Sequence, residues 1–283
     1  MKLLSLSALG AAAILFTVSA AVATPITFTA SGTAAGNSVS ASAQFTFSGD
    51  NLTIVLTNTS GAATGQDVPG STLTGLFFDL TGNPTLTPVS ATASDIVQEG
   101  ECDTGDCSGT GVDVGGEFGY QHESGSGFPN GAGEGIASAG YITTGLPHNI
   151  GNFNNGAAGT DLDSPASLDG INFGIVSNSY ANPNGGLASE PLVQDHVTFF
   201  LSGVDGLDNL DISNVSFQYG TSFSEANIPA TPVQPVPGPD GLLMFATGLL
   251  LLAGLGYASR KKSWTRGDDA RLFTSDLDED LAV

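Results

Sequence analysis

The clearest pattern along the chain is a strict alternation of apolar and polar residues. In Ser38–Phe47 every second residue is apolar, and residues 52–57 repeat this alternation after a Gly-Asp-Asn turn at 49–51. Neighbouring side chains of a β-strand point to opposite faces of the sheet, so the pattern predicts two strands with one buried face each. The short turn between them predicts a β-hairpin.

Further strands are predicted before and after a middle region that is rich in Gly and Asn. Leu73–Leu80 is a nearly continuous apolar run, which indicates a central strand. Pro88 interrupts the run at 85–93, which indicates an edge strand or a bulge. Alternation returns in His196–Leu201 and in Ile212–Tyr219. Shorter strands joined by long loops are expected near 117–121, 136–143 and 171–176.

Residues 24–227 form the body of the chain, and they contain no apolar stripe at helical spacing. Short strands with Gly, Asn and Asp turns between them are typical of two packed sheets. The sequence therefore predicts an all-β domain, an antiparallel β-sandwich or jelly-roll-like fold with long Gly/Asn-rich loops. At 40% apolar residues the chain has enough material for one hydrophobic core.

The two ends of the chain carry signals of a different kind. Residues 1–23 combine Lys2, an apolar stretch and a small-x-small sequence at 21–23, which is typical of a secretory signal peptide. Gly241–Ser259 is a run of 19 residues without a charge, long enough to span a bilayer as a helix. Residues 260–283 follow as a polar tail. The ends therefore predict an exported body on a helix in the inner membrane.

The order of three C-terminal features resembles a known sorting signal. Residues 228–240 are rich in Pro and predict an extended linker with a Pro-x-Pro motif, and the apolar helix and a basic cluster come after it. By the positive-inside rule the basic cluster stays in the cytoplasm. The motif is Pro237, Gly238 and Pro239, and the basic cluster is Arg260, Lys261 and Lys262.

This arrangement is similar to the sorting signal of PEP-CTERM proteins, the exosortase-dependent surface proteins of Gram-negative bacteria. The strand sequences at 43–59, 73–80 and 212–221 also resemble segments of such proteins. The resemblance implies cleavage near the Pro motif by an exosortase-type enzyme, and transfer to the cell surface or extracellular matrix. It implies no catalytic residue. The chain departs from the family pattern at Gly238, where Glu is usual, and in the 21 residues after the basic cluster.

Charge excludes several classes of function. The chain has 28 acidic and 6 basic residues, and no Lys or Arg lies between Pro25 and Ser259. A surface without cations cannot neutralise phosphates, so nucleic acid is excluded as a partner. Chemistry that depends on a phosphate-binding Lys is excluded for the same reason. The exported part is a polyanion.

Cys102 and Cys107 are the only cysteines of the chain. Export brings them into an oxidising compartment, which favours a disulfide that closes a small loop. Zinc binding by two thiolates and a third ligand is the alternative, although no second cysteine pair is present.

Clusters of Asp on Gly-rich loops raise the possibility of calcium, which binds several oxygen ligands. Their spacing matches no EF-hand, since Pro165 occupies the fifth position of the second cluster and no Gly occupies the sixth. No other cofactor is expected. The candidate ligands are Asp103, Asp106, Asp161, Asp163 and Asp169.

We expect a non-enzymatic surface or matrix protein. The three histidines show no metal-ligand spacing and are expected as isolated surface or turn residues, and no Gly-x-Ser-x-Gly elbow is present. A secreted hydrolase would need a cleft that the sequence does not indicate. The main alternative is a carbohydrate-binding module, with extracellular polysaccharide as the partner. Its binding platform would consist of exposed rings from among Tyr120, Phe128, Tyr141 and Tyr180.

Overall fold

A computed structural model describes most of the body of the chain. The described residues are 24–61, 68–97, 109–122, 128–139, 171–180, 186–188 and 190–233, with Leu162 and Leu249 as single positions. The chain divides into two compact units at Val233. Among the described residues, no helix is long and apolar enough to cross a membrane. The signal peptide and, apart from Leu249, the predicted membrane helix lie outside them.

The described residues are mostly β-strand, as predicted, and their helices are short 3-10 turns. The turns are η1 (Pro69–Ser71), η2 (Gly115–Glu117), η3 (Pro129–Gly131) and η4 (Asn209–Asp211). The strands are β1 (Ile26–Ala34), β2 (Asn37–Ser48), β3 (Asn51–Asn58), β4 (Leu73–Leu80), β5 (Thr87–Val97), β6 (Val112–Asp113), β7 (Gly119–His122), β8 (Glu134–Ala137), β9 (Ile175–Val176), β10 (Leu192–Ser202), β11 (Ile212–Tyr219), β12 (Asn227–Pro229) and β13 (Thr231–Val233).

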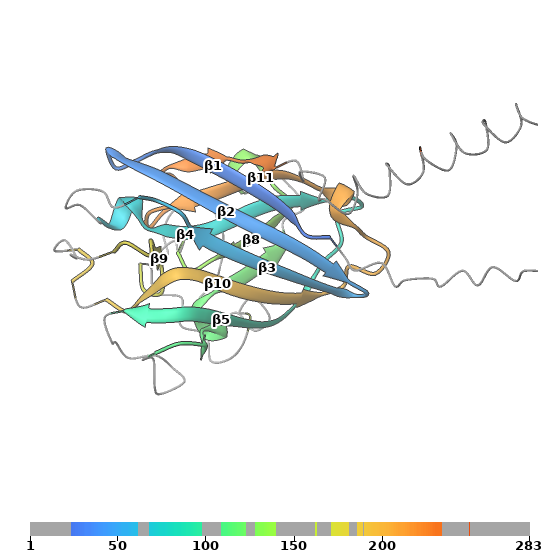
Figure 1. The fold of residues 1–283 in the computed structure, drawn as a ribbon, viewed down its shortest axis with the longest axis horizontal. Coiled ribbons are helices and arrows are strands. Elements are labelled where there is room, and N and C mark those ends of the chain that lie inside the picture. Colours follow the sequence, from blue (N-terminus) through green and yellow to red (C-terminus); the bar gives the residue numbers. More distant parts are fainter. Residues whose placement is uncertain are drawn as a thin grey trace, which may run out of the picture. The chain divides into compact units, whose positions relative to one another are not determined.

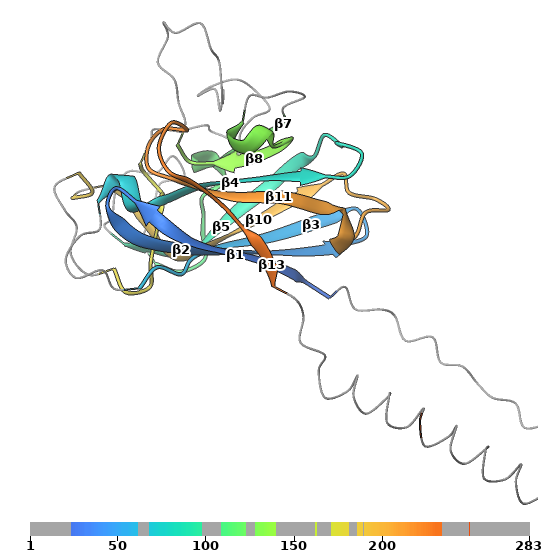
Figure 2. The same ribbon diagram turned by 90° about the horizontal axis from the view of Figure 1, so that it is seen from above.

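The strands form one hydrogen-bonded sheet that folds over into two layers. Its order is β12-β11-β4-β9-β10-β3-β2-β1-β13, and β5 pairs with β10 beside this path. Figure 1 shows β2, β3, β10 and β5 side by side, and Figure 2 shows β4, β11 and β8 stacked over β1 and β2. The core lies between the layers, where the rings of Phe45 and Phe78 pack edge to face at 5.3 Å.

The predicted hairpin is present. β2 pairs with β3 in antiparallel register, with Ser48 opposite Asn51 across the turn. The alternation fixes the buried face, because Phe45 and Ile54 are fully buried while Gln44 is exposed. β1 was not predicted. It pairs with β2 along its whole length but buries small residues such as Ala34, which give a weak apolar signal.

The sheet is mixed and not purely antiparallel as predicted. β9 pairs in parallel with β10 and in antiparallel with β4, at Ile175, and so joins the two layers on one side. The side chain of Asn58 donates a hydrogen bond of 2.8 Å to the Ile175 carbonyl oxygen and fixes this joint to β3. Parallel pairing is possible because a long connection, and no tight turn, separates β9 from β10.

A single terminal segment joins the layers on the other side. Residues 227–229 (β12) pair with β11, and residues 231–233 (β13) pair with β1. Ala230 lies between them and donates its N–H to the Val215 carbonyl oxygen at 2.8 Å. A strand that changes sheets in this way forms a corner of the fold. The sheet therefore takes in the first part of the segment predicted as a Pro-rich linker.

β4 is central, as its sequence predicts, because both of its faces are covered. Phe78 points into the main core, and Phe77 points to the opposite face. There Phe77 packs against Phe128 at 5.1 Å and against Phe223 at 5.0 Å between ring centroids. A consecutive pair of Phe residues on a strand thus needs a cover on each side of the sheet.

Candidate functional site

Most of the residues that the sequence singles out lie outside the described part of the chain, and their roles stay predictions. Among the described residues, no three His, Cys, Asp or Glu side chains gather where they could hold a metal ion. The residues outside are Cys102, Cys107, Asp103, Asp106, Asp161, Asp163, Asp169, Pro237, Gly238, Pro239, Arg260, Lys261 and Lys262.

The most connected polar cluster is a buried carboxyl group with two partners from one neighbouring strand. Glu134 in β8 is fully buried. Tyr120 and His122 in β7 lie two residues apart and so share a face. The Tyr120 hydroxyl donates to Glu134 Oε2 at 2.6 Å, and His122 Nδ1 lies 3.0 Å from Glu134 Oε1. His122 is therefore not the isolated histidine that the sequence suggests.

The pKa values of this cluster are shifted by burial, in a part of the chain that contains no Lys or Arg. Burial raises the pKa of Glu134, and the hydrogen bonds from Tyr120 and His122 oppose this shift only in part. Burial and the nearby carboxyl group of Glu134 also raise the pKa of Tyr120. The backbone N–H of Leu86 donates to the Tyr120 hydroxyl at 2.8 Å. The cluster thus binds β7 and β8 to the chain before β5, which is a structural role.

A second cluster brings Ser, His and Asp together at a β-bulge of β10. Asp195 has a φ of 79°, and its Oδ2 atom lies 2.7 Å from His196 Nδ1. Ser94 in β5 donates to the carbonyl oxygens of Gln194 and His196, and its Oγ accepts the His196 N–H at 3.0 Å. The recorded hydrogen bonds of the serine hydroxyl go to the backbone and not to the imidazole ring. This arrangement lacks the contact by which a histidine activates a serine nucleophile.

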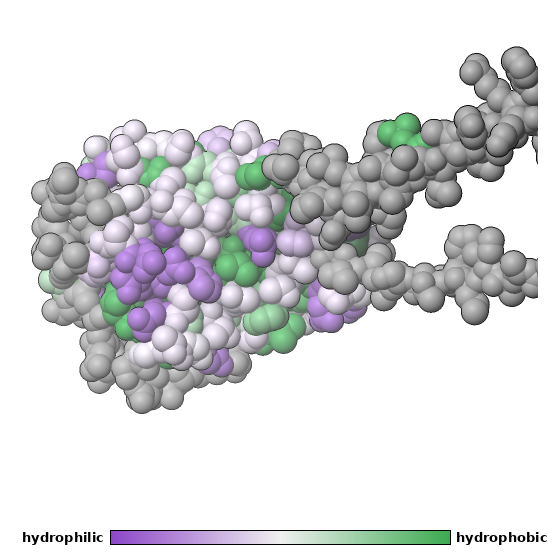
Figure 3. Space-filling model, in the orientation of Figure 1, coloured by the Kyte–Doolittle hydropathy of each residue, from purple (hydrophilic) through white to green (hydrophobic). Residues whose placement is uncertain are grey.

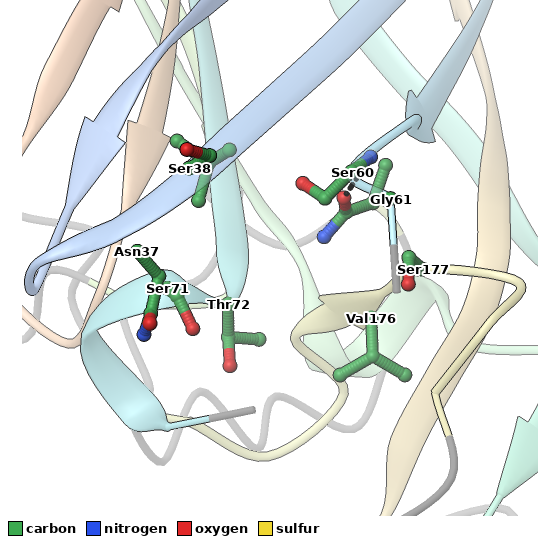
Figure 4. Close-up of a pocket in the computed structure, with 10 residues that line it drawn as sticks. Asn37, Ser38, Ser60, Gly61, Ser71, Thr72, Val176 and Ser177 are labelled. Atoms are coloured by element: carbon green, nitrogen blue, oxygen red, sulfur yellow. Dashed lines mark hydrogen bonds between the residues drawn. The ribbon is translucent and has the colours of Figure 1, made fainter. Parts of the chain in front are cut away.

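Two hollows are lined by hydroxyl and amide groups. The first has a cavity volume of about 10 Å³, enough for about one water molecule, and its lining includes Asn58, Ser60 and Thr72 (Figure 4). The second is an open groove of about 500 Å³ between β1, β2 and the terminal segment. Its lining is uncharged and consists of Thr29, Ala30, Ser31, Ser40, Ala41, Thr59, Pro229 and Thr231.

The aromatic platform suggested from the sequence is not formed by Tyr120 and Phe128. Both are only 3% exposed. Tyr120 is held inside by its hydrogen bond to Glu134, and Phe128 packs on Phe77. Tyr180 is partly buried against a small apolar cluster, and Tyr141 lies outside the described residues. The local sequence pattern does not show that either ring is covered, because Glu134 and Phe77 lie on other strands.

A different ring is exposed, and the sequence contains a signal for it. Phe200 in β10 is 39% exposed, whereas its neighbour Phe199 is fully buried. Two consecutive Phe residues on a strand point to opposite faces, so the second ring needs its own cover or stays in solvent. In the β4 pair, the ring of Phe77 is covered by Phe128 and Phe223. Phe200 lies on the outer face of β10 and is partly exposed.

Comparison of the chain with protein-family models, with curated proteins and with solved structures gives no match in any of the three. The function must therefore be argued from the residues themselves.

Proposed function

We propose that this protein is a non-enzymatic, exported protein of the cell surface or extracellular matrix, with a PEP-CTERM-like sorting signal. Its body is a β-sandwich with jelly-roll-like character. The observation that supports the proposal most directly is the position at which the folded sheet ends. β13 ends at Val233, and the Pro motif at Pro237 follows closely in the sequence. A folded body followed at once by a cleavage motif, an apolar helix and a basic cluster suits release by a membrane-bound processing enzyme.

The composition of the body supports a structural role. Its surface carries acidic groups and no Lys or Arg, so it attracts water and counterions and repels other polyanions. The two polar clusters of the described residues serve local structure and lack the geometry of a hydrolase site. A hydrated, negatively charged body held at the surface is suited to a matrix.

Cell fractionation tests the sorting proposal. The wild-type chain should be found in the surface fraction without its C-terminal segment, and so shorter than residues 24–283. A variant with Pro237→Ala and Pro239→Ala should keep the C-terminal segment and remain in the inner-membrane fraction. A matched variant with Pro232→Ala, which changes a proline of β13 ahead of the motif, should be processed as the wild type. Wild-type protein at the surface with its C-terminal segment intact would contradict the proposal.

A carbohydrate-binding role is the second candidate, and one observation favours it. The exposed ring of Phe200 lies on a sheet face and takes the place of the buried rings suggested from the sequence. Binding of polysaccharide would give the surface protein its contact with the matrix.

A further inference from the structure

The ring of Phe200 lies in the middle of a sheet face. β10 pairs with β3 on one side and with β5 on the other, so Phe200 is not at an edge. Among the exposed large apolar side chains of the described residues, it is the only aromatic one. Single exposed apolar residues are common on protein surfaces and carry no meaning by themselves. The neighbours of this ring therefore decide its significance.

A β-bulge brings a second apolar side chain to the same face. The pairing of β5 with β10 shifts register directly after the Phe200–Ser90 pair, and Val89 is the extra residue. Val89 is 51% exposed. Pro88 marks this bulge in the sequence, as predicted. Bulges commonly redirect a side chain near functional sites.

A third apolar side chain comes from the other neighbouring strand. Thr53 of β3 lies opposite Phe200, and Val55 lies two residues further along the same face. Diagonal neighbours of this kind are about 7–8 Å apart, within reach of an aromatic ring. Val55, Val89 and Phe200 are the apolar side chains that the strand pairing brings to this face, and together we call them the Phe200 patch.

Hydroxyl groups surround the Phe200 patch, and no charge lies on these strand segments. Thr53 and Ser90 are the cross-strand partners of Phe200, and Thr198 lies two residues before it in β10. The segments 40–48, 51–59, 87–94 and 197–202 contain no charged residue. Figure 3 shows this side of the molecule as a pale surface with separate apolar areas and, to the left of centre, a hydrophilic area.

We propose that the Phe200 patch binds a neutral polysaccharide, with one sugar ring stacked on Phe200. The C–H face of a pyranose is apolar and fits an aromatic ring, while its hydroxyl groups fit the Thr and Ser side chains around the patch. A site of apolar side chains with a few surrounding polar groups is the usual design for a small polar ligand. The inference deepens the surface role proposed above and names the matrix component that the protein contacts.

The charges of the body favour a neutral glycan over an acidic one and over a second copy of the chain. An acidic polysaccharide would meet no Lys or Arg, and it would approach a chain with a net charge of −22. A second copy of the chain would bring the same negative charge. A neutral polysaccharide meets no such charge repulsion.

Affinity electrophoresis of the full chain tests the proposal. The protein is kept in a detergent without a sugar headgroup, which would otherwise compete for the site. The gels contain soluble β-glucan, xyloglucan or galactomannan as neutral probes, and polygalacturonate as the acidic probe. At least one neutral probe should retard the wild type, and polygalacturonate should not.

The Phe200→Ala variant should lose affinity by about tenfold or more, since loss of an aromatic anchor usually dominates binding. Phe200→Tyr should keep the affinity within about threefold, because the stacking surface is retained. Leu210→Ala removes another exposed apolar side chain, 90% exposed in η4, and should bind as the wild type. Unfolding temperatures within about 2 °C of the wild type would show that the variants remain folded, as expected for surface changes.

Failure to bind all three neutral probes, or equal binding by Phe200→Ala and the wild type, would overturn the proposal. So would retardation by polygalacturonate alone. These outcomes leave the sorting proposal untouched, because processing is measured by fractionation and not by affinity.

Discussion

At the scale of single residues, two buried tyrosine hydroxyl groups differ in whether they have hydrogen-bond partners. The Tyr120 hydroxyl is fully used, as donor to Glu134 and as acceptor from the Leu86 backbone. The Tyr219 hydroxyl is buried without a hydrogen-bond partner. Burial raises the pKa of both phenols. The same residue type thus stabilises the fold at one position and weakens it at another.

Removing each hydroxyl should change stability in opposite directions. Tyr120→Phe removes the donor to Glu134 Oε2 and the acceptor of the Leu86 N–H, and should lower the free energy of unfolding by about 1–3 kcal/mol. Tyr219→Phe removes an unpaired buried group and should raise it by about 1 kcal/mol. Thermal unfolding of both variants measures the difference, and each is the control for the other. Equal changes in the two variants would contradict the hydrogen-bond assignment.

Glu134 should make stability depend on pH with a definite sign. Its pKa is raised in the folded protein, so the folded state holds the proton more firmly than the unfolded chain. The contribution of Glu134 to the free energy of unfolding is therefore complete below the unfolded pKa, about 4.5. This contribution is lost as the pH rises through the folded pKa. Glu134→Gln cannot titrate, so its unfolding temperature relative to wild type should rise from pH 4 to pH 7. Parallel curves for the two proteins would show that the carboxyl group does not titrate with folding.

At the scale of elements, the outer face of β4 depends on close packing of β8. A Cβ atom at Gly135 would lie 2.8 Å from Phe77 Cε1 and 3.1 Å from Phe128 Cε2. Both rings are buried and pack against each other, so either must disturb the other in order to move aside. A glycine at this position allows the short strand to cover the aromatic cluster.

Gly135→Ala should therefore lower the free energy of unfolding by about 1–3 kcal/mol through overpacking. Gly61→Ala is the matched control, because a Cβ atom at Gly61 would meet no atom of the described residues within 4 Å. The control should unfold within about 0.5 kcal/mol of the wild type, as surface substitutions usually do. Chemical denaturation of the two variants measures both values, and a stable Gly135→Ala variant would contradict the packing described for β8.

How much the sequence predicts depends on where each element finds its partner. β2, β4 and β11 agree with their predicted ranges to within one residue, because alternation or a continuous apolar run determines their burial. β9 is shorter than its expected range at 171–176, because it is held only by short contacts to β4 and β10. β13 was predicted as part of a linker, since its pairing with β1 connects residues at opposite ends of the body.

The candidate site was the least predictable feature, for the same physical reason. Burial of Phe128 depends on Phe77 in another strand, and the sequence pattern around Phe128 does not show it. Exposure of Phe200 is in principle visible in the sequence, because a Phe doublet on an alternating strand must place one ring outside. Whether that ring is covered depends on the tertiary structure.

At the scale of the whole molecule, sorting is the role proposed for the two ends of the chain, and the surface role is proposed for the body between them. All six basic residues lie outside the segment from Pro25 to Ser259, and the described sheet ends before the Pro motif. What would remain at the surface after processing is an acidic body in which the Phe200 patch lies among strand segments without charged residues. The central claim is that the C-terminal segment is an address that is removed.

Intact-mass spectrometry of protein extracted from the cell surface tests this claim most directly. The account predicts a chain that begins at Thr24, after the signal peptide, and ends near Pro237. A mass that corresponds to a chain ending at Val283 would contradict it.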